Sequence, residues 1–381
     1  MLQSLFNSLS GMFSFSRGLD NVSNNISNMN TPGFRGTDSF FESVGQGRGS
    51  RVASDGLRTG PGEIRQTGNA TDLAIDGSGF FVLRDPDGRL HYTRAGQFRF
   101  NEDGILIDSV TRFEVMAIRD DGTLESINVQ GANILAPVAT TRVNVTGNLS
   151  PSATTVPLSN IRVFSANGEA QTLSATFTNT SATTPDSWSV NITNAAGATV
   201  GTGTIRFTAG LPATGANTVT VTLPGSGQVI TVNFGDAGTT TGLTQISGLS
   251  NAPAARAADG REALARTGVS IDDQGRIQYQ YGSERREGPR IALGFIQNEG
   301  DLEMESGRLV SGVRANDVQF GRAGEGQFGS ISGGSLELAN VDLTQEFADM
   351  IVIQRGYQAS SRVMTVTNEM LQNLFDATRG R

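Results

Sequence analysis

The sequence has no cysteine, no lysine and a single histidine, and each absence limits what the chain can do. Without cysteine there is no disulfide, no thiolate nucleophile and no cysteine-ligated zinc site. His91 falls in the alternating stretch "RLHYTR", which favours a packed or surface strand residue over a catalytic one. A Ser–His–Asp triad would need this histidine, and no G-x-S-x-G segment offers a serine partner for it. The sequence therefore predicts no catalytic, cofactor or metal site.

Charged residues are also scarce: they make up 17% of the chain, and the formal net charge is −8. An acidic chain argues against a nucleic-acid partner, which needs a basic surface. No apolar run reaches the roughly 18 residues that span a membrane, and residues 1–30 show no cleavable secretory signal. The segments "DPDG" (85–88) and "NEDG" (101–104) match calcium loops weakly. We interpret both as hairpin turns, because Asp, Asn and Gly tolerate positive φ.

Both ends of the chain carry apolar residues at the spacing of a coiled coil. The columns repeat every seven residues, and Asp342 is placed to cap the second helix. Two helices are therefore predicted, over residues 2–29 and 342–376. The predicted seam and subunit-interface residues are Leu5, Met12, Phe15, Leu19, Val22 and Ile26, with Leu343, Phe347, Met350, Tyr357, Met364 and Leu371 from the second helix.

The stretch "NNISNMNTPGF" (24–34) ends the first predicted helix with four asparagines. Asparagine is a mediocre helix former, because its amide competes for backbone hydrogen bonds. We interpret Asn25 and Asn30 as interface residues, since a neutral amide donates and accepts without the desolvation cost of a charge. A hinge is predicted where this helix stops, at Thr31, Pro32, Gly33 and Phe34.

Between the predicted helices the pattern is that of β-strands separated by Asp-Gly and similar turns. Residues 145–255 carry only five charges in 111 positions, yet Trp188 and rows of β-branched residues argue against a disordered linker. We predict a multidomain, mainly β chain with nested domains built from both chain ends. These domains are a terminal helical coiled coil (1–30 and 342–381), connecting segments (31–71 and 331–341), a split β domain (72–144 and 261–330) and an inserted outer β-barrel or sandwich (145–260).

Several segments resemble the bacterial flagellar axial proteins of the rod and hook. The stretch "NNISNMNTPGFR" is similar to their N-terminal signature, and "SLELANVDLTQEFADMIVIQRGYQASSRVMTVTNEMLQNL" is similar to their C-terminal one. The inner pieces "LAIDGSGFFVLRDPDGRLHYTRAGQFRFNEDGILID" and "GVSIDDQGRIQYQYGS" follow the same family pattern. The insert contains "IRVFSANGEAQTLSATFTNT" and looks like the outer domain of hook members, which rod members generally lack.

The resemblance implies a structural, non-enzymatic hook subunit that polymerises into a curved tube and transmits torque as a universal joint. It implies that the terminal helices surround a central export channel and that the insert is outermost. The implied partners are further copies of the chain, the rod, the hook-cap, hook-length control and hook–filament junction proteins, and the type III export apparatus. The implied location is extracellular, reached without a cleavable signal and without membrane insertion.

Two alternatives stay open. A distal rod subunit would share the terminal signatures. An extracellular carbohydrate-binding or hydrolytic β protein would account for the Thr-, Ser- and Gly-rich middle, and carboxylate pairs for glycoside chemistry are defined only by their separation in space. Such a protein would not account for helical seams at both ends.

Overall fold

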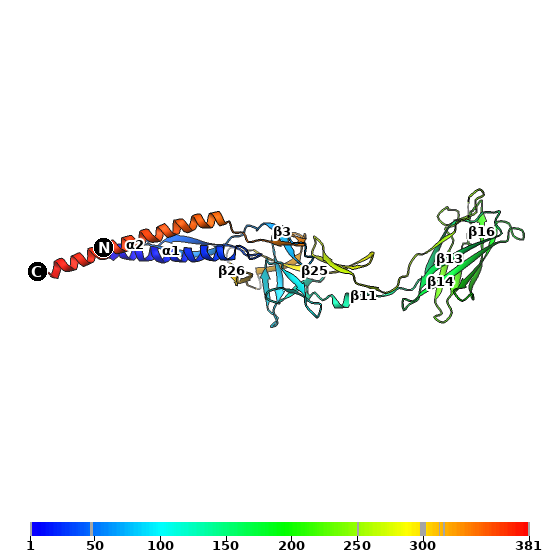
Figure 1. Ribbon diagram of the computed structural model, residues 1–381, viewed down its shortest axis with the longest axis horizontal. Coiled ribbons are helices and arrows are strands. Elements are labelled where there is room, and N and C mark those ends of the chain that lie inside the picture. Colours follow the sequence, from blue (N-terminus) through cyan, green and yellow to red (C-terminus); the bar gives the residue numbers. More distant parts are fainter. Residues whose placement is uncertain are drawn as a thin grey trace. The chain divides into compact units, whose positions relative to one another are not determined.

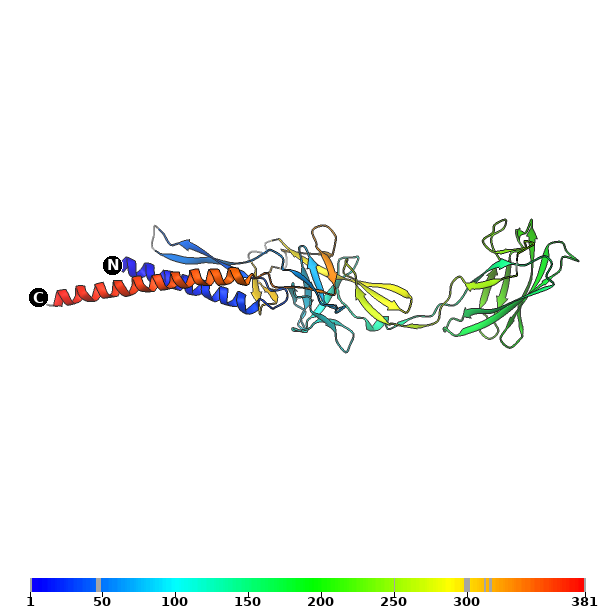
Figure 2. The same ribbon diagram turned by 45° about the horizontal axis from the view of Figure 1, so that its top comes forward.

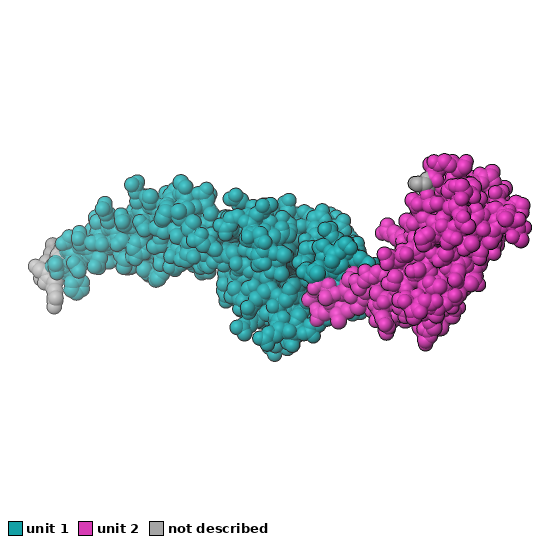
Figure 3. Space-filling model, turned by 45° about the vertical axis from the view of Figure 1, so that its right-hand side comes forward, with its two compact units in different colours: residues 1–132, 267–381 teal, residues 133–266 magenta. Residues whose placement is uncertain are grey.

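The computed structural model describes residues 2–45, 49–249, 251–297, 302–311, 313–314 and 317–379. The chain divides into two compact units, one built from residues 1–132 and 267–381 and the other from residues 133–266 (Figure 3). The first unit is therefore assembled from both ends of the chain, and the second is an insertion into it.

The first unit contains α1 (Leu2–Asn28) and α2 (Leu343–Arg379), the only α-helices of the described ranges. They lie side by side in both views, so the predicted packing of the two terminal helices is confirmed (Figures 1 and 2). Asp342 caps α2 as predicted, because its Oδ1 accepts hydrogen bonds from the N–H groups of Gln345 (3.1 Å) and Thr344 (2.8 Å). These bonds lower the pKa of the Asp342 carboxyl.

A hairpin of β1 (Thr37–Ser43) and β2 (Ser50–Leu57) lies along α1. The Ser14 hydroxyl donates a hydrogen bond of 2.9 Å to the Ser50 carbonyl, which ties β2 to the helix. The ring centroids of Phe15 and Phe41 are 6.2 Å apart, so β1 also packs on α1. The hairpin thus places aromatic side chains beside the helix pair.

The β part of the first unit is an antiparallel sheet of 12 strands, counted over the described residues. Its main path is β23 (Gly268–Ile271), β24 (Arg276–Tyr281), β25 (Glu284–Ile296), β9 (Glu114–Ile118), β5 (Phe80–Arg84), β6 (Leu90–Thr93), β27 (Leu309–Ser311) and β26 (Glu303–Glu305), with β7 (Phe98–Phe100), β8 (Leu106–Asp108), β10 (Leu124–Ser126) and β28 (Val318–Arg322) paired to it. β25 pairs with β5 and β9, and β27 pairs with β6, so strands from both sides of the insertion share this sheet.

Shorter elements complete the first unit. The "DPDG" and "NEDG" segments form the predicted hairpin turns, with hydrogen bonds of 3.0 Å from Gly88 N–H to the Asp85 carbonyl and from Gly104 N–H to the Asn101 carbonyl. The remaining elements are β4 (Leu73–Asp76) paired with β29 (Ser330–Gly333), β3 (Ile64–Gln66) paired with β30 (Ser335–Glu337), and the 3-10 helix η1 (Gln130–Ala132).

The second unit is built from two sheets that enclose one core, as predicted for the insert. Trp188, Phe177 and Phe234 are fully buried in this core, and outward positions alternate with them along the strands. The first sheet contains β18 (Thr218–Thr222), β19 (Val229–Asn233), β12 (Arg142–Asn148), β20 (Leu243–Thr244) and β21 (Ala254–Ala257). The second contains β13 (Thr155–Phe164), β14 (Ala170–Asn179), β15 (Ser187–Asn194), β16 (Thr199–Thr208) and β17 (Leu211–Pro212). Separately, β11 (Ile134–Leu135) pairs with β22 (Leu264–Ala265).

Asp259 ties the start of β12 to the end of the second unit. Its Oδ1 accepts hydrogen bonds from the N–H groups of Thr141 (2.8 Å) and Arg142 (2.9 Å), and its Oδ2 accepts one from the Thr141 hydroxyl. Partial burial alone would raise the pKa of this carboxyl, but these hydrogen bonds outweigh burial and lower it. The carboxylate therefore adds stability above the unfolded-state pKa, and this stability is lost as pH falls through the lower folded-state pKa.

We predict that Asp259→Ala lowers the free energy of unfolding of the second unit by about 0.5–1.5 kcal/mol at neutral pH, because the N–H groups of Thr141 and Arg142 lose their acceptor. The variant should also lose less stability than the parent as the pH falls below about 4. Trp188 is the only tryptophan and lies in this core, so its fluorescence during thermal unfolding reports on this unit alone. Asp236→Ala, which removes an exposed acid from the same unit, is the control. If the stability of Asp259→Ala fell with pH as much as that of the parent, the stabilising role of the Asp259 carboxylate would be contradicted.

Candidate assembly interface

The seam between α1 and α2 is made largely of small side chains. A Cβ added to Gly11 would lie 2.9 Å from the Ser360 hydroxyl oxygen. One added to Gly356 would lie 2.6 Å from the ring of Phe15. Side chains at these glycines would collide, so their absence lets the helices approach closely. The pairing is antiparallel, since residues further along α1 face residues earlier on α2.

The predicted seam residues flank this line of small side chains. The close approach puts Gly11 and Gly18 of α1 in buried positions, while Ser14 is buried against β2. Their role in contacts between subunits stays a prediction. Val22 and Asn25 are buried; Leu5, Met12, Phe15, Leu19, Ile26, Met350, Met364 and Leu371 are half-buried; and Asn30, Leu343, Phe347 and Tyr357 are exposed.

A buried polar cluster holds one end of the seam. Glu346 is fully buried, and its Oε1 lies 2.7 Å from Nη1 of Arg58. Its Oε2 accepts a hydrogen bond of 3.2 Å from the Asn25 amide. Arg58 also pairs with Asp38, at 2.7 Å. Burial alone would lower the pKa of Arg58, but hydrogen bonds and charge from Asp38 and Glu346 raise it above its ordinary value.

The Asn25 side chain forms its hydrogen bonds within this chain. It is 1% exposed, its amide donates to the Thr37 carbonyl (3.0 Å), and its oxygen accepts from the Thr37 N–H (2.9 Å). The expectation that this amide pairs across to another subunit therefore does not fit the side chain, because the chain reverses after α1 and lays β1 against the same face. Sequence reasoning missed Glu346 as its partner, although this acid stands seven residues before Ile353 in the seam.

The segment after α1 is packed onto the β part of the first unit. Gly33 has a φ of 71°, and a Cβ there would lie 2.3 Å from the backbone nitrogen of Ala95. Its N–H donates a hydrogen bond of 2.8 Å to the Glu337 carbonyl. Phe34 is 1% exposed, while Thr31 and Pro32 are half-buried. These contacts fix the path between helix and sheet, and hinge motion here stays a prediction.

Glu337 is the centre of a second buried cluster, which the sequence did not reveal. Its two carboxylate oxygens lie 3.1 Å from Arg35 and 3.2 Å from Arg94, and all three side chains are at most 5% exposed. The Gly62 N–H donates a further hydrogen bond of 3.0 Å to Glu337. The cluster joins residues that are far apart in the chain, so no local sequence pattern predicts it.

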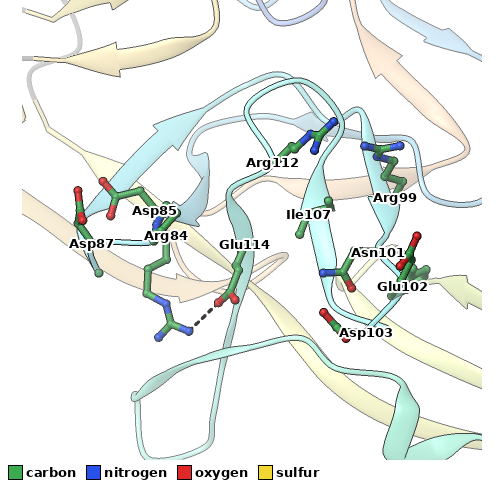
Figure 4. A pocket seen from close by; sticks show the side chains of 13 residues that line it. Arg84, Asp85, Asp87, Arg99, Asn101, Glu102, Asp103, Ile107, Arg112 and Glu114 are labelled. Carbon is green, nitrogen blue, oxygen red and sulfur yellow. Dashed lines mark hydrogen bonds and ion pairs between the residues drawn. The ribbon is translucent and has the colours of Figure 1, made fainter.

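A charged groove of about 940 Å³ lies among the hairpin ends of the β part (Figure 4). Arg84 and Glu114, which are neighbours on strands β5 and β9, pair at 2.7 Å in its wall, and Arg99 and Arg112 also line it. His91 lies nearby, bonded through Nε2 to Asp85 at 3.1 Å. Across the described ranges, no three His, Cys, Asp or Glu side chains are grouped to hold a metal ion. No described helix is long and apolar enough to cross a membrane.

Both helices keep large apolar side chains in solvent after pairing with each other. On α1, Phe6 is 60% and Phe13 is 69% exposed. Exposed apolar surface of this extent is typical of sites of protein association. The exposed apolar residues of α2 are Leu343, Phe347, Ile351, Val352, Tyr357, Val363, Val366, Met370, Leu374 and Phe375.

Three models of known protein families match parts of the chain. Residues 5–35 match the model described as flagella basal body rod protein, and residues 332–377 match flagellar basal body rod FlgEFG protein C-terminal. Residues 74–148 match the model described as flagellar hook protein FlgE/F/G D1 domain. These matches define an axial protein of the flagellar rod and hook.

Individual relatives show which member of this class the chain resembles. The chain is 31% identical to flagellar hook protein FlgE of Brucella suis, covering 97% of this chain and 98% of the relative. It is 28% identical to FlgE of Escherichia coli K12, with 96% and 98% covered. The chain belongs to the flagellar hook protein FlgE family, as the resemblance implied, and is a structural subunit of the hook, not an enzyme. The solved Helicobacter pylori flagellar hook protein FlgE2 aligns with a TM-score of 0.49 at 13% identity, covering 73% of this chain and 100% of that one.

We predict that Glu337→Gln lowers the free energy of unfolding of the first unit by about 3–5 kcal/mol, because two buried arginines lose their charge partner. Denaturant unfolding followed by helical circular dichroism measures this change. Glu287→Gln is the matched control, since Glu287 pairs with Arg276 at 2.7 Å but is 64% exposed. The control should change stability by less than about 0.5 kcal/mol, and equal effects of the two variants would argue against a structural role for the buried cluster.

Proposed function

We propose that copies of this chain polymerise into a curved tube that passes torque from the motor and rod to the filament as a universal joint. The observation that supports this most is the apolar surface left on the paired helices. Burying a large apolar side chain contributes about 1.5–3 kcal/mol. Phe13 remains 69% exposed and Val352 67% exposed in one copy. Packing helix pair against helix pair removes this surface from water.

In this proposal the helix pairs form the inner wall of the tube, around a central export channel. The split β domain surrounds them, and the insert forms the outer surface. The insert has five charges in residues 145–255, so neighbouring inserts can slide past one another without breaking many ion pairs. Such sliding would let each subunit lengthen and shorten its contacts as the joint turns.

The ends of the tube meet other flagellar proteins in this proposal. These are the rod, the hook-cap, hook-length control and hook–filament junction proteins, and the chain reaches the cell exterior through the type III export apparatus without a cleavable signal. Membership of the hook family is the support for these partners and for this route. A distal rod subunit remains the nearest rival, and a straight assembly would favour it.

We predict that Phe13→Asp and Phe347→Asp each prevent hook formation while leaving the secreted monomer folded, because both side chains are already exposed in one copy. Loss of one phenylalanine contact corresponds to about a tenfold to hundredfold weaker subunit addition. Electron microscopy of cells and circular dichroism of the secreted chain measure the two effects.

The matched control is Gln358→Asp, which adds the same charge at an exposed polar position of α2. Hooks should form normally in this variant. Normal hooks in Phe13→Asp and Phe347→Asp would refute the proposal that this apolar surface drives assembly.

A further inference from the structure

α2 extends past the start of α1. Gly11 lies opposite Ser360, and α1 begins at Leu2, nine residues before Gly11. Because the helices are antiparallel, the residue of α2 opposite Leu2 is Glu369, nine residues after Ser360. No residue of α1 therefore lies opposite residues 370–379 of α2. Both views show the end of α2 beyond the start of α1 (Figures 1 and 2). We call residues 370–379 the overhang; at the standard helical rise it is about 15 Å long.

The overhang carries apolar side chains on the side that faces α1 elsewhere. Leu374 stands seven residues after Thr367 and fourteen after Ser360. Thr367 is 6% exposed, and Ser360 contacts Gly11, so this column points into the seam. Leu374 is nevertheless 53% exposed and its neighbour Phe375 is 63% exposed. The overhang therefore continues the seam surface without a helix to cover it.

A groove at the opposite end of the helix pair matches this segment. It has a volume of about 420 Å³ and lies between α1, α2 and β1. Its α2 wall runs from Gln345 to Ile353, about 13 Å at the helical rise, which is close to the length of the overhang. We call this the root groove; its exposed apolar lining includes Phe40 (56%), Phe41 (46%) and Val352 (67%).

The polar cluster described above gives the root groove fixed walls. Asn25 and Arg58 belong to the lining, and their bonds to Glu346 join α1 and the residue that follows β2 to α2. The buried Asn25 amide and the partly buried Arg58 guanidinium already have partners, so an apolar helix can enter without leaving these groups unpaired. A preformed groove of this kind suits a docking helix, because less ordering is required on binding.

We propose that the overhang of one copy docks in the root groove of a second copy. The overhang and the groove lie at opposite ends of the helix pair, so the contact is head-to-tail and uses two different surfaces. A contact of this type repeats from copy to copy and generates an open filament or a ring. The proposal rests on the polymeric function above and adds the pair of surfaces that meet along the row.

The test is a disulfide between copies, which the absence of native cysteine makes unambiguous. Val352→Cys and Leu374→Cys are introduced together in the full chain, and isolated hooks are mildly oxidised. Both residues lie on α2, 22 positions or about 33 Å apart, so they cannot bond within one copy. We expect a ladder of covalent multimers on a non-reducing gel. Gln358→Cys with Leu374→Cys is the matched control, because Gln358 is an exposed polar residue of α2 outside the groove, and it should give monomer.

Intact hooks without a ladder from the groove pair would overturn the docking, as would a ladder from the control pair alone. A second test applies if the cysteine variants fail to assemble. Val352→Asp and Leu374→Arg should each reduce the number of hooks at least tenfold. The double variant, in which the two new charges attract, should restore at least half of them. No restoration in the double variant would also overturn the docking. Failure of the parent chain to form hooks would instead refute the proposed function.

Discussion

The carboxylate of Glu337, held between Arg35 and Arg94, is the constraint on which the first unit depends. A charge buried this deeply costs several kcal/mol unless it is paired. The three side chains must therefore meet, although they come from the segment after α1, the segment before α2 and the central sheet. Their meeting brings the end of α1 beside the beginning of α2, and this makes the helix pair possible.

The side chains between the two helices differ in kind from those on the outside of the pair. Small and polar residues such as Gly11, Ser360 and Asn25 face the partner helix of the same copy. Phe15 and Ile353 also lie between the helices, whereas other large apolar residues such as Phe6, Phe13 and Phe347 are exposed. A chain that buried its large side chains in its own seam would form a stable hairpin and would have little surface left for other copies. Much apolar surface of the helices is thus left for the contacts between copies that we propose.

The parts of this structure that follow from local periodicity could be predicted from the sequence. Seven-residue columns through Leu5 and Leu343 located both helices, and Asp-Gly turns with alternating runs located the sheets. The centre of the seam could not be located this way, because glycine and serine carry no hydrophobic signal at Gly11 or Ser360. The Arg35–Glu337–Arg94 cluster also escaped, since its members are charged residues far apart in the chain. The sequence drew attention to Asn25, but its partner Glu346 lies 321 positions away.

The second unit begins and ends at the same place. Ile134 and Leu135 pair with Ala265 and Leu264, Val138 bridges to Arg261, and Asp259 caps the start of β12. The entering and leaving strands are thus fastened to each other before the sandwich starts. Insertions of this form are tolerated because the flanking residues stay close together whatever lies between them. The sandwich could therefore be exchanged as a unit during evolution, while the domain built from both chain ends is inherited unchanged.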